Sequence, residues 1–183
     1  MKGTFPITKF VIAGLTSLAT HFCYAQDEPI FPVPEKTPDQ LFYMQRTPNA
    51  NTIIYDLNRK DGELDKADPI HVYWIRYGDK GQQAELSGVQ RKFAYGIRTN
   101  LVAPEKYEIR FNANKKALMT LTKGKDNEYH VFATIRQKPA ILHKIYLKID
   151  GGTFWSPNVE YAELTGTDPD SGALVVERVK IEK

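Results

Sequence analysis

The chain has 183 residues, a formal net charge of +3, 42% hydrophobic and 26% charged residues, and one cysteine. This length suggests one domain with a tail, and the hydrophobic and aromatic content excludes a disordered or collagen-like chain. A lone cysteine excludes an internal disulfide framework and a zinc site of the CxxC type. The small net charge and the lack of a recognition motif argue against nucleic-acid binding.

Residues 1–25 have the pattern of a secretory signal peptide. Lys2 and Lys9 precede an apolar run of about ten residues, and a short polar stretch ends at Ala25. The run is too short for a membrane-spanning helix, which needs about 20 residues; the alternative is a buried N-terminal helix. We expect cleavage after Ala25 and export to the periplasm or beyond the cell.

Cleavage after Ala25 would change the composition of the chain. Of 183 residues, 158 would remain; Lys2, Lys9 and Cys23 would be lost, and the net charge would fall to +1. The mature chain would then have no cysteine and no transmembrane segment. An exported protein without disulfides is ordinary in a bacterial periplasm.

The mature chain divides into a proline-rich arm, residues 26–39, and a single β-rich domain, residues 40–183. Four prolines between residues 29 and 38 favour an extended segment. This arm is either a tether or a strap that packs on the domain through Ile30, Phe31 and Val33.

Alternation of apolar and polar residues predicts ten strands in the β-rich domain. Short turns between them favour antiparallel neighbours, in a barrel or a two-sheet sandwich. One short helix is expected near residues 84–94, with an apolar stripe of Leu86, Val89 and Phe93, or starting at Ser87 in a capping box with Gln90. The predicted strands are Leu41–Arg46, Thr52–Leu57, Ile70–Tyr77, Tyr95–Val102, Tyr107–Asn112, Ala117–Thr122, Tyr129–Arg136, Ile141–Ile149, Val159–Thr165 and Leu174–Ile181.

Residues 56–68 carry five acidic side chains around Gly62. A calcium loop of the EF-hand type places oxygen donors at positions 1, 3 and 5 and glycine at position 6. Aligning Gly62 to position 6 puts Leu57 and Arg59 at donor positions, so the pattern is broken. The segment is either an acidic connection between strands or a weak, irregular calcium site.

Three histidines, His71, His130 and His143, fall on separate predicted strands. If these strands met, the imidazoles could form a metal site, and a metal-assisted hydrolase would follow. Each histidine also fits a structural role within its strand. The chain lacks the metalloprotease, nucleophile-elbow and phosphate-loop motifs, so the sequence indicates no cofactor and leans against an enzyme.

The middle of the chain is basic and aromatic. Residues 71–150 carry 15 basic and seven acidic residues, whereas both flanking regions are acidic. Arg76, Arg98, Arg110 and Arg136 could form an anion-binding face or a solvated one. Gly96 is suited to a close approach of the helix to the sheet. The strand around Trp74 has apolar residues on both faces, which indicates a packing centre or a ligand pocket.

Several of these segments resemble the family named domain of unknown function 4833. The resemblance rests on Asp56-x-Asn58 with Asp61-Gly62, Asp68-Pro69 through Tyr77, Glu85-Leu86-Ser87 and Ala94-Tyr95-Gly96, and it spans about residues 30–181. It implies a small exported protein of Bacteroidetes-like bacteria. No activity and no site residue come with it.

We therefore expect an exported, non-catalytic module that binds a small anionic or lipid-like ligand or a cell-envelope partner. Tyr73, Arg76, Tyr95 and Arg98 are the candidate contacts, with arginine holding an anionic group and the rings packing an apolar portion. The alternatives are the metal-assisted hydrolase and a purely structural envelope protein.

Overall fold

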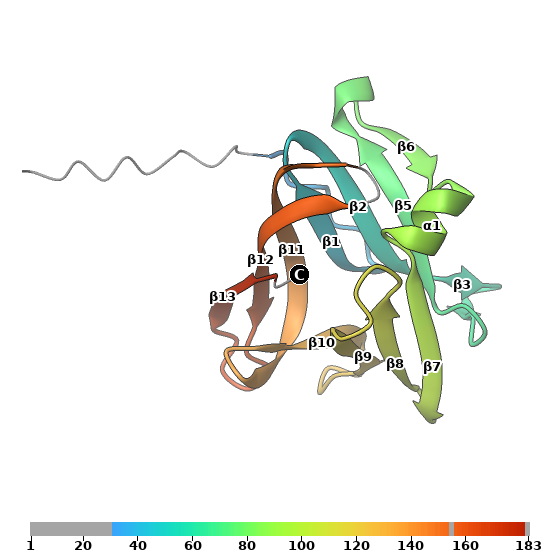
Figure 1. Ribbon diagram of the computed structural model, residues 1–183. Helices are drawn as coiled ribbons and strands as arrows, with labels where there is room; N and C mark the ends of the chain where they lie inside the picture. Colours follow the sequence, from blue (N-terminus) through green and yellow to red (C-terminus); the bar gives the residue numbers. More distant parts are fainter. Residues whose placement is uncertain (1–30, 154–155, 182–183) are drawn as a thin grey trace, which may run out of the picture. The chain divides into compact units, whose positions relative to one another are not determined.

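The computed structural model describes residues 31–153 and 156–181, so the predicted signal peptide and its expected cleavage site lie outside the described part. This described part is mainly β, as predicted, with one short α-helix (Figure 1). The strands are β1 (Gln40–Arg46), β2 (Asn49–Leu57), β3 (Arg59–Lys60), β4 (Glu63–Leu64), β5 (Ile70–Arg76), β6 (Gln82–Glu85), β7 (Ile97–Ala103), β8 (Lys106–Phe111), β9 (Leu118–Lys123), β10 (Tyr129–Ile135), β11 (Lys138–Gly152), β12 (Pro157–Thr167) and β13 (Leu174–Lys180).

Eleven strands form one strongly curved sheet, and the short strands β3 and β4 form a separate hairpin (Figure 1). The order β6-β5-β2-β1-β11-β10-β9-β8-β7 runs through the long strand β11, which also pairs with β12. The first residues of β11 pair with β10, while its residues 144–147 pair in parallel with the end of β1. We call β1, β2, β5 and β6 the first wing, and β7 to β10 the second wing.

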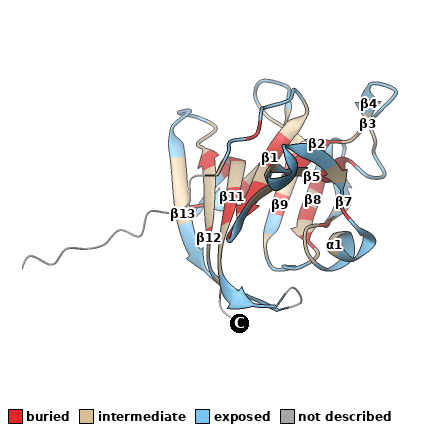
Figure 2. Ribbon diagram, turned by 90° about the horizontal axis from the view of Figure 1, so that it is seen from above, coloured by how far each residue is buried: buried red, intermediate tan, exposed pale blue. Residues whose placement is uncertain are grey.

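The core lies between the two wings. Phe42 of β1 stacks on Tyr55 of β2 with ring centroids 4.3 Å apart, and Phe111 of β8 meets both rings edge-on. Buried residues accordingly lie on β1, β2, β5, β8 and β11, while β13 and the helix are mostly exposed (Figure 2). Aromatic contacts thus hold the wings together where no backbone pairing joins them.

All ten predicted strands are present, with ends shifted by a few residues. Gln82–Glu85, part of which was expected in the helix, instead pairs with β5 as β6. The helix α1 (Gly88–Phe93) begins at Ser87 in the predicted capping box with Gln90. Its predicted apolar stripe is wrong, because Val89 and Phe93 are exposed and Leu86, which is buried, precedes the helix.

Gly96 brings the end of α1 against the second wing, as predicted. A Cβ at this position would lie 1.9 Å from the Arg91 carbonyl oxygen and 2.8 Å from Nδ2 of Asn112. Nδ2 of Asn112 donates to the same Arg91 carbonyl oxygen at 2.7 Å. The backbone N–H of Asn112 donates to the Gly96 carbonyl. Only glycine leaves room for this contact, which fixes the neighbouring Tyr95.

The arm lies against the domain at its described end. Nε2 of Gln45 donates to the Pro32 carbonyl at 2.8 Å, and the ring of Phe31 contacts that of Tyr146. Pro34 is buried, whereas Val33 is 76% exposed and does not anchor the arm. No helix among the described residues has the length and apolar character needed to cross a bilayer.

Candidate ligand-binding site

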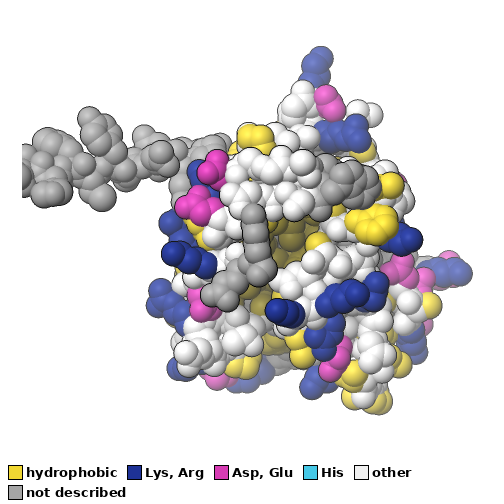
Figure 3. Space-filling model, in the orientation of Figure 1, with side chains coloured by type: hydrophobic (Ala, Val, Ile, Leu, Met, Phe, Trp, Pro, Cys, Tyr) yellow, Lys and Arg dark blue, Asp and Glu magenta, His cyan; other side chains and the backbone are white. Residues whose placement is uncertain are grey.

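A cavity of about 710 Å³ opens between the wings, with β11, β12 and β13 along one side. Its walls are mostly apolar and include Met44, Phe111, Ile145, Leu147 and Leu164. The hollow is visible as an apolar recess bordered by Lys and Arg side chains (Figure 3). Its volume falls within the range of about 300–1,000 Å³ that is typical of small-ligand sites.

Arg46, a half-buried residue of β1, is one of the charged residues that line this cavity. Its guanidinium lies 5.9 Å from the Trp74 ring centroid and 5.7 Å from that of Tyr95. Nε of Arg46 is buried and has no hydrogen-bond partner among the described residues. The aromatic contacts offset part of the cost of burying the cation, but the Nε–H bond is left unmade.

The electrostatics of the cavity are one-sided. Its described charged lining residues are Arg46 and Lys116, both cationic. Burial raises the pKa of the Tyr95 hydroxyl, with Arg46 acting in the opposite direction, so Tyr95 is neutral at physiological pH. The Tyr55 hydroxyl donates to the Tyr95 carbonyl at 3.1 Å, which ties Tyr95 to the core. The cavity therefore carries positive charge with no compensating carboxylate in its described lining.

Of the four residues predicted to contact a ligand, Tyr95 lines the cavity and Tyr73 does not. Tyr73 lies on the opposite face of β5 from Trp74, and its hydroxyl donates to Oδ2 of Asp56 at 2.9 Å. Burial, followed by the charge of Asp56, raises the pKa of Tyr73, while burial raises the pKa of Asp56. This pair is packed into the outer face of the first wing.

The predicted arginines also lie outside the cavity lining. Arg76 is exposed and pairs with Asp79 at 3.9 Å, and Nε of Arg98 donates to Asn112 at 2.9 Å. Arg110 pairs with Glu108, and Nε of Arg136 donates to the Val176 carbonyl. Separate partners hold these four arginines, and the structure does not bring them together into an anion site.

The three histidines do not converge either. His71 on β5 bonds to Glu85 at 2.8 Å, and β2, β1 and β11 separate β5 from β10, which carries His130. His130 bonds to Asp126, and His143 shares a hydrogen bond with the Thr167 hydroxyl. Burial lowers the pKa of His143. Within residues 31–153 and 156–181, no cluster of three or more His, Cys, Asp or Glu side chains is placed to hold a metal ion.

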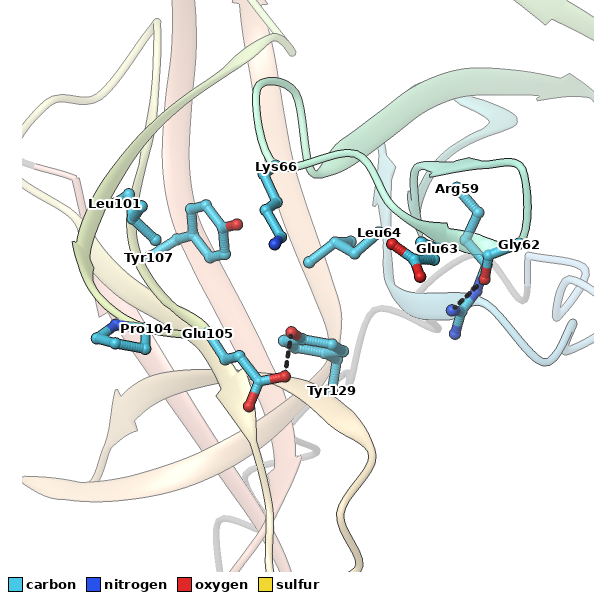
Figure 4. Close-up of a pocket in the computed structure, with 10 residues that line it drawn as sticks. All are labelled: Arg59, Gly62, Glu63, Leu64, Lys66, Leu101, Pro104, Glu105, Tyr107 and Tyr129. Carbon is cyan, nitrogen blue, oxygen red and sulfur yellow. Dashed lines mark hydrogen bonds between the residues drawn. The ribbon is translucent and has the colours of Figure 1, made fainter.

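The acidic segment around Gly62 forms the β3–β4 hairpin, with Asp61 and Gly62 at positive φ in its turn. The hairpin borders a second hollow of about 510 Å³ (Figure 4). In this polar hollow, Nε of Arg59 donates to Asp39 at 2.6 Å, and the Tyr129 hydroxyl donates to Glu105 at 3.4 Å.

Local hydrogen bonds to the backbone hold this hairpin region. Oδ1 of Asp65 accepts from the backbone N–H groups of Ala67 and Asp68 at 2.9 and 3.3 Å. Asn58 donates from Nδ2 to the Asp68 carbonyl at 2.8 Å. These bonds are those of an acidic connection between two strands, which was one of the two interpretations of residues 56–68.

Sequence reasoning missed Arg46, although its strand carried a signal. Phe42, Met44 and Arg46 alternate along β1, so the arginine lies on the face of two buried apolar residues. A cation that continues an apolar face indicates either a strand end in solvent or a charge turned toward the core. The pairing of Arg46 with Leu147 of β11 places it beside the cavity.

Comparison with known proteins adds a family and nothing more. The family model described as Domain of unknown function (DUF4833) matches residues 42–178, well over half of the chain. Neither the curated proteins nor the solved structures provide a match.

Proposed function

The chain belongs to the domain of unknown function 4833 family, and from that premise we propose that it binds an amphiphile with an apolar chain and an anionic head. The observation that carries this proposal is that Arg46 lines a largely apolar cavity while its buried Nε has no hydrogen-bond partner among the described residues. The function remains that of a non-catalytic binding module.

The physical argument concerns the cost of a buried guanidinium N–H that has no acceptor. Leaving a buried N–H without an acceptor costs about 1–3 kcal/mol, and more when the group is charged. A carboxylate removes this cost because the planar guanidinium can donate two parallel hydrogen bonds to it. The apolar walls contributed by Met44, Ile145 and Leu164 would then bury the hydrocarbon part of the ligand.

The location of this function follows from the N-terminal sequence. We propose that residues 1–25 direct export and are removed after Ala25, leaving the binding domain in the periplasm or outside the cell. The basic start and the short apolar run support this proposal. N-terminal sequencing of the exported protein tests it, and retention of Met1 would contradict it.

The binding proposal is tested with dodecanoate and with dodecanol, its uncharged counterpart. In Arg46→Met, whose side chain keeps the apolar stem of arginine, we expect the affinity for dodecanoate to fall about tenfold or more, since a charged hydrogen-bond pair is lost. Dodecanol should bind the variant at least as well as the wild type. Isothermal titration calorimetry measures both affinities.

Two matched controls separate this assignment from the sequence-based one. Arg76→Met and Arg98→Met remove the same charge from outside the cavity lining, and both should bind dodecanoate as the wild type does. Loss of binding in these variants, with Arg46→Met unaffected, would restore the sequence-based assignment. Dodecanoate binding that is equal in all four proteins would refute the role of Arg46.

A further inference from the structure

The mouth of the apolar cavity is itself apolar. Four residues that line the cavity are also substantially exposed, with exposures of 53% for Phe93, 45% for Leu118, 40% for Val179 and 38% for Ile181. They come from α1, from β9 and from the C-terminal strand and its end, which are far apart in sequence. Together they form the rim, a set of large apolar side chains around one opening.

Lysines accompany these apolar residues. Nζ of Lys92 lies 5.1 Å from the centroid of the Phe93 ring. Lys115 and Lys116 are exposed on the connection that leads into Leu118, and Lys116 lines the cavity. No acidic side chain is among the described lining residues. The opening thus combines exposed apolar groups with cations (Figure 3).

We propose that this rim docks on the surface of an anionic lipid bilayer. Large apolar side chains enter the boundary between headgroups and acyl chains, and lysines beside them are attracted to anionic lipids. The rim is continuous with the cavity, so a docked protein exposes its ligand site to the bilayer. The entry of an amphiphile by this route rests on the proposed function, whereas docking itself does not.

The test measures sedimentation of the purified protein with phosphatidylcholine vesicles, with and without phosphatidylglycerol. The double variant Lys92→Glu/Lys115→Glu, called the rim variant, reverses two charges beside the rim without changing a residue of the cavity lining. We expect its binding to the anionic vesicles to fall about tenfold or more. The matched control is Lys60→Glu/Lys66→Glu, which makes the same charge change beside the β3–β4 hairpin and should bind as the wild type does.

The comparison among variants cancels any contribution of the N-terminal segment, because all share it. Wild-type binding that needs phosphatidylglycerol and is lost only in the rim variant supports docking. An equal loss of vesicle binding in both double variants, or no binding of the wild type to either kind of vesicle, overturns the docking proposal. The rim would then be assigned to contact with another protein. The rim variant should keep wild-type affinity for dodecanoate, so failure of the binding proposal and failure of docking remain distinguishable.

Discussion

The two hollows of this domain differ in how their charges are satisfied. In the polar hollow beside the β3–β4 hairpin, Arg59 pairs with Asp39, and Glu105 pairs with Lys123 at 2.8 Å. In the apolar cavity between the wings, Nε of Arg46 is buried with no described partner. Arg59 and Glu105 of the polar hollow thus have partners of opposite charge, whereas no carboxylate is among the described lining residues of the apolar cavity.

This difference teaches which hollow to regard as a binding site. Exposed ion pairs are common on protein surfaces and contribute little to stability, so the polar hollow needs no ligand to explain its charges. A buried guanidinium N–H without a hydrogen-bond acceptor is rare because it is costly. The larger cavity therefore carries a functional interpretation on the basis of one side chain, Arg46, rather than on the basis of its size.

The walls of the two hollows should also differ in their importance to the fold. Phe111 is 8% exposed and meets both Phe42 and Tyr55, so Phe111→Ala should destabilise the domain by about 3–5 kcal/mol. Urea denaturation followed by tryptophan fluorescence measures the free energy of unfolding. Phe111 also lines the apolar cavity, so the site and the core share this wall.

The matched variant in the polar hollow is Leu101→Ala. Leu101 lines that hollow but is 55% exposed, and its truncation should change the free energy of unfolding by about 0.5 kcal/mol or less. A comparable loss in both variants would mean that the polar hollow is as much a part of the core as the apolar cavity.

The second prediction concerns the contact that fixes Tyr95 at the apolar cavity. In Gly96→Ala the new methyl group would meet the Arg91 carbonyl oxygen at 1.9 Å, a backbone atom that cannot move freely. We expect a loss of about 3 kcal/mol in the free energy of unfolding, together with weaker dodecanoate binding. Thermal denaturation and calorimetry report the two effects.

Gly88→Ala, at the start of the preceding helix α1, is its control. Nothing lies within 4 Å of a Cβ at Gly88, so alanine should stabilise the protein by about 0.5 kcal/mol through its better helix propensity. If Gly96→Ala behaved like Gly88→Ala, the close approach between α1 and the second wing would not constrain the cavity.

The strands were predictable because alternation is a local signal. Phe42 and Met44, or Val131 and Ala133, mark one buried face without any knowledge of the neighbouring strands. The same logic failed for Gln82–Glu85, where residues that suit a helix form β6 because β5 offers a pairing edge.

The candidate site was less predictable because it depends on contacts between distant segments. The aromatic context of Tyr95 predicts its place at a pocket, whereas the position of Arg76 and Arg98 in a basic region says nothing about their neighbours. Arg46 lies beside the cavity through the parallel pairing of β1 with β11, about 100 residues later in the chain. Short turns predict antiparallel neighbours and carry no signal for this pairing.

The smallest expected effect lies in the polar hollow, where Glu105→Gln removes an exposed ion pair with Lys123. The hydrogen bond from Lys123 lowers the pKa of Glu105 below its ordinary value. Its contribution to stability is therefore present above the unfolded-state pKa and is lost as the pH falls through the lowered folded-state pKa. The variant should be slightly less stable than the wild type at neutral pH, and equal to it in acid or at high salt.

Asp56→Asn should change the stability at neutral pH in the opposite direction. Burial raises the pKa of Asp56, so the ionised form is disfavoured in the folded state and destabilises it at neutral pH. The asparagine keeps an acceptor for the Tyr73 hydroxyl, and it should raise the melting temperature at neutral pH, with the gain vanishing as the pH falls below the pKa of Asp56. Melting curves at several pH values compare the two carboxylates. Equal signs for both substitutions would contradict the distinction between an exposed, paired carboxylate and a half-buried one held against Tyr73.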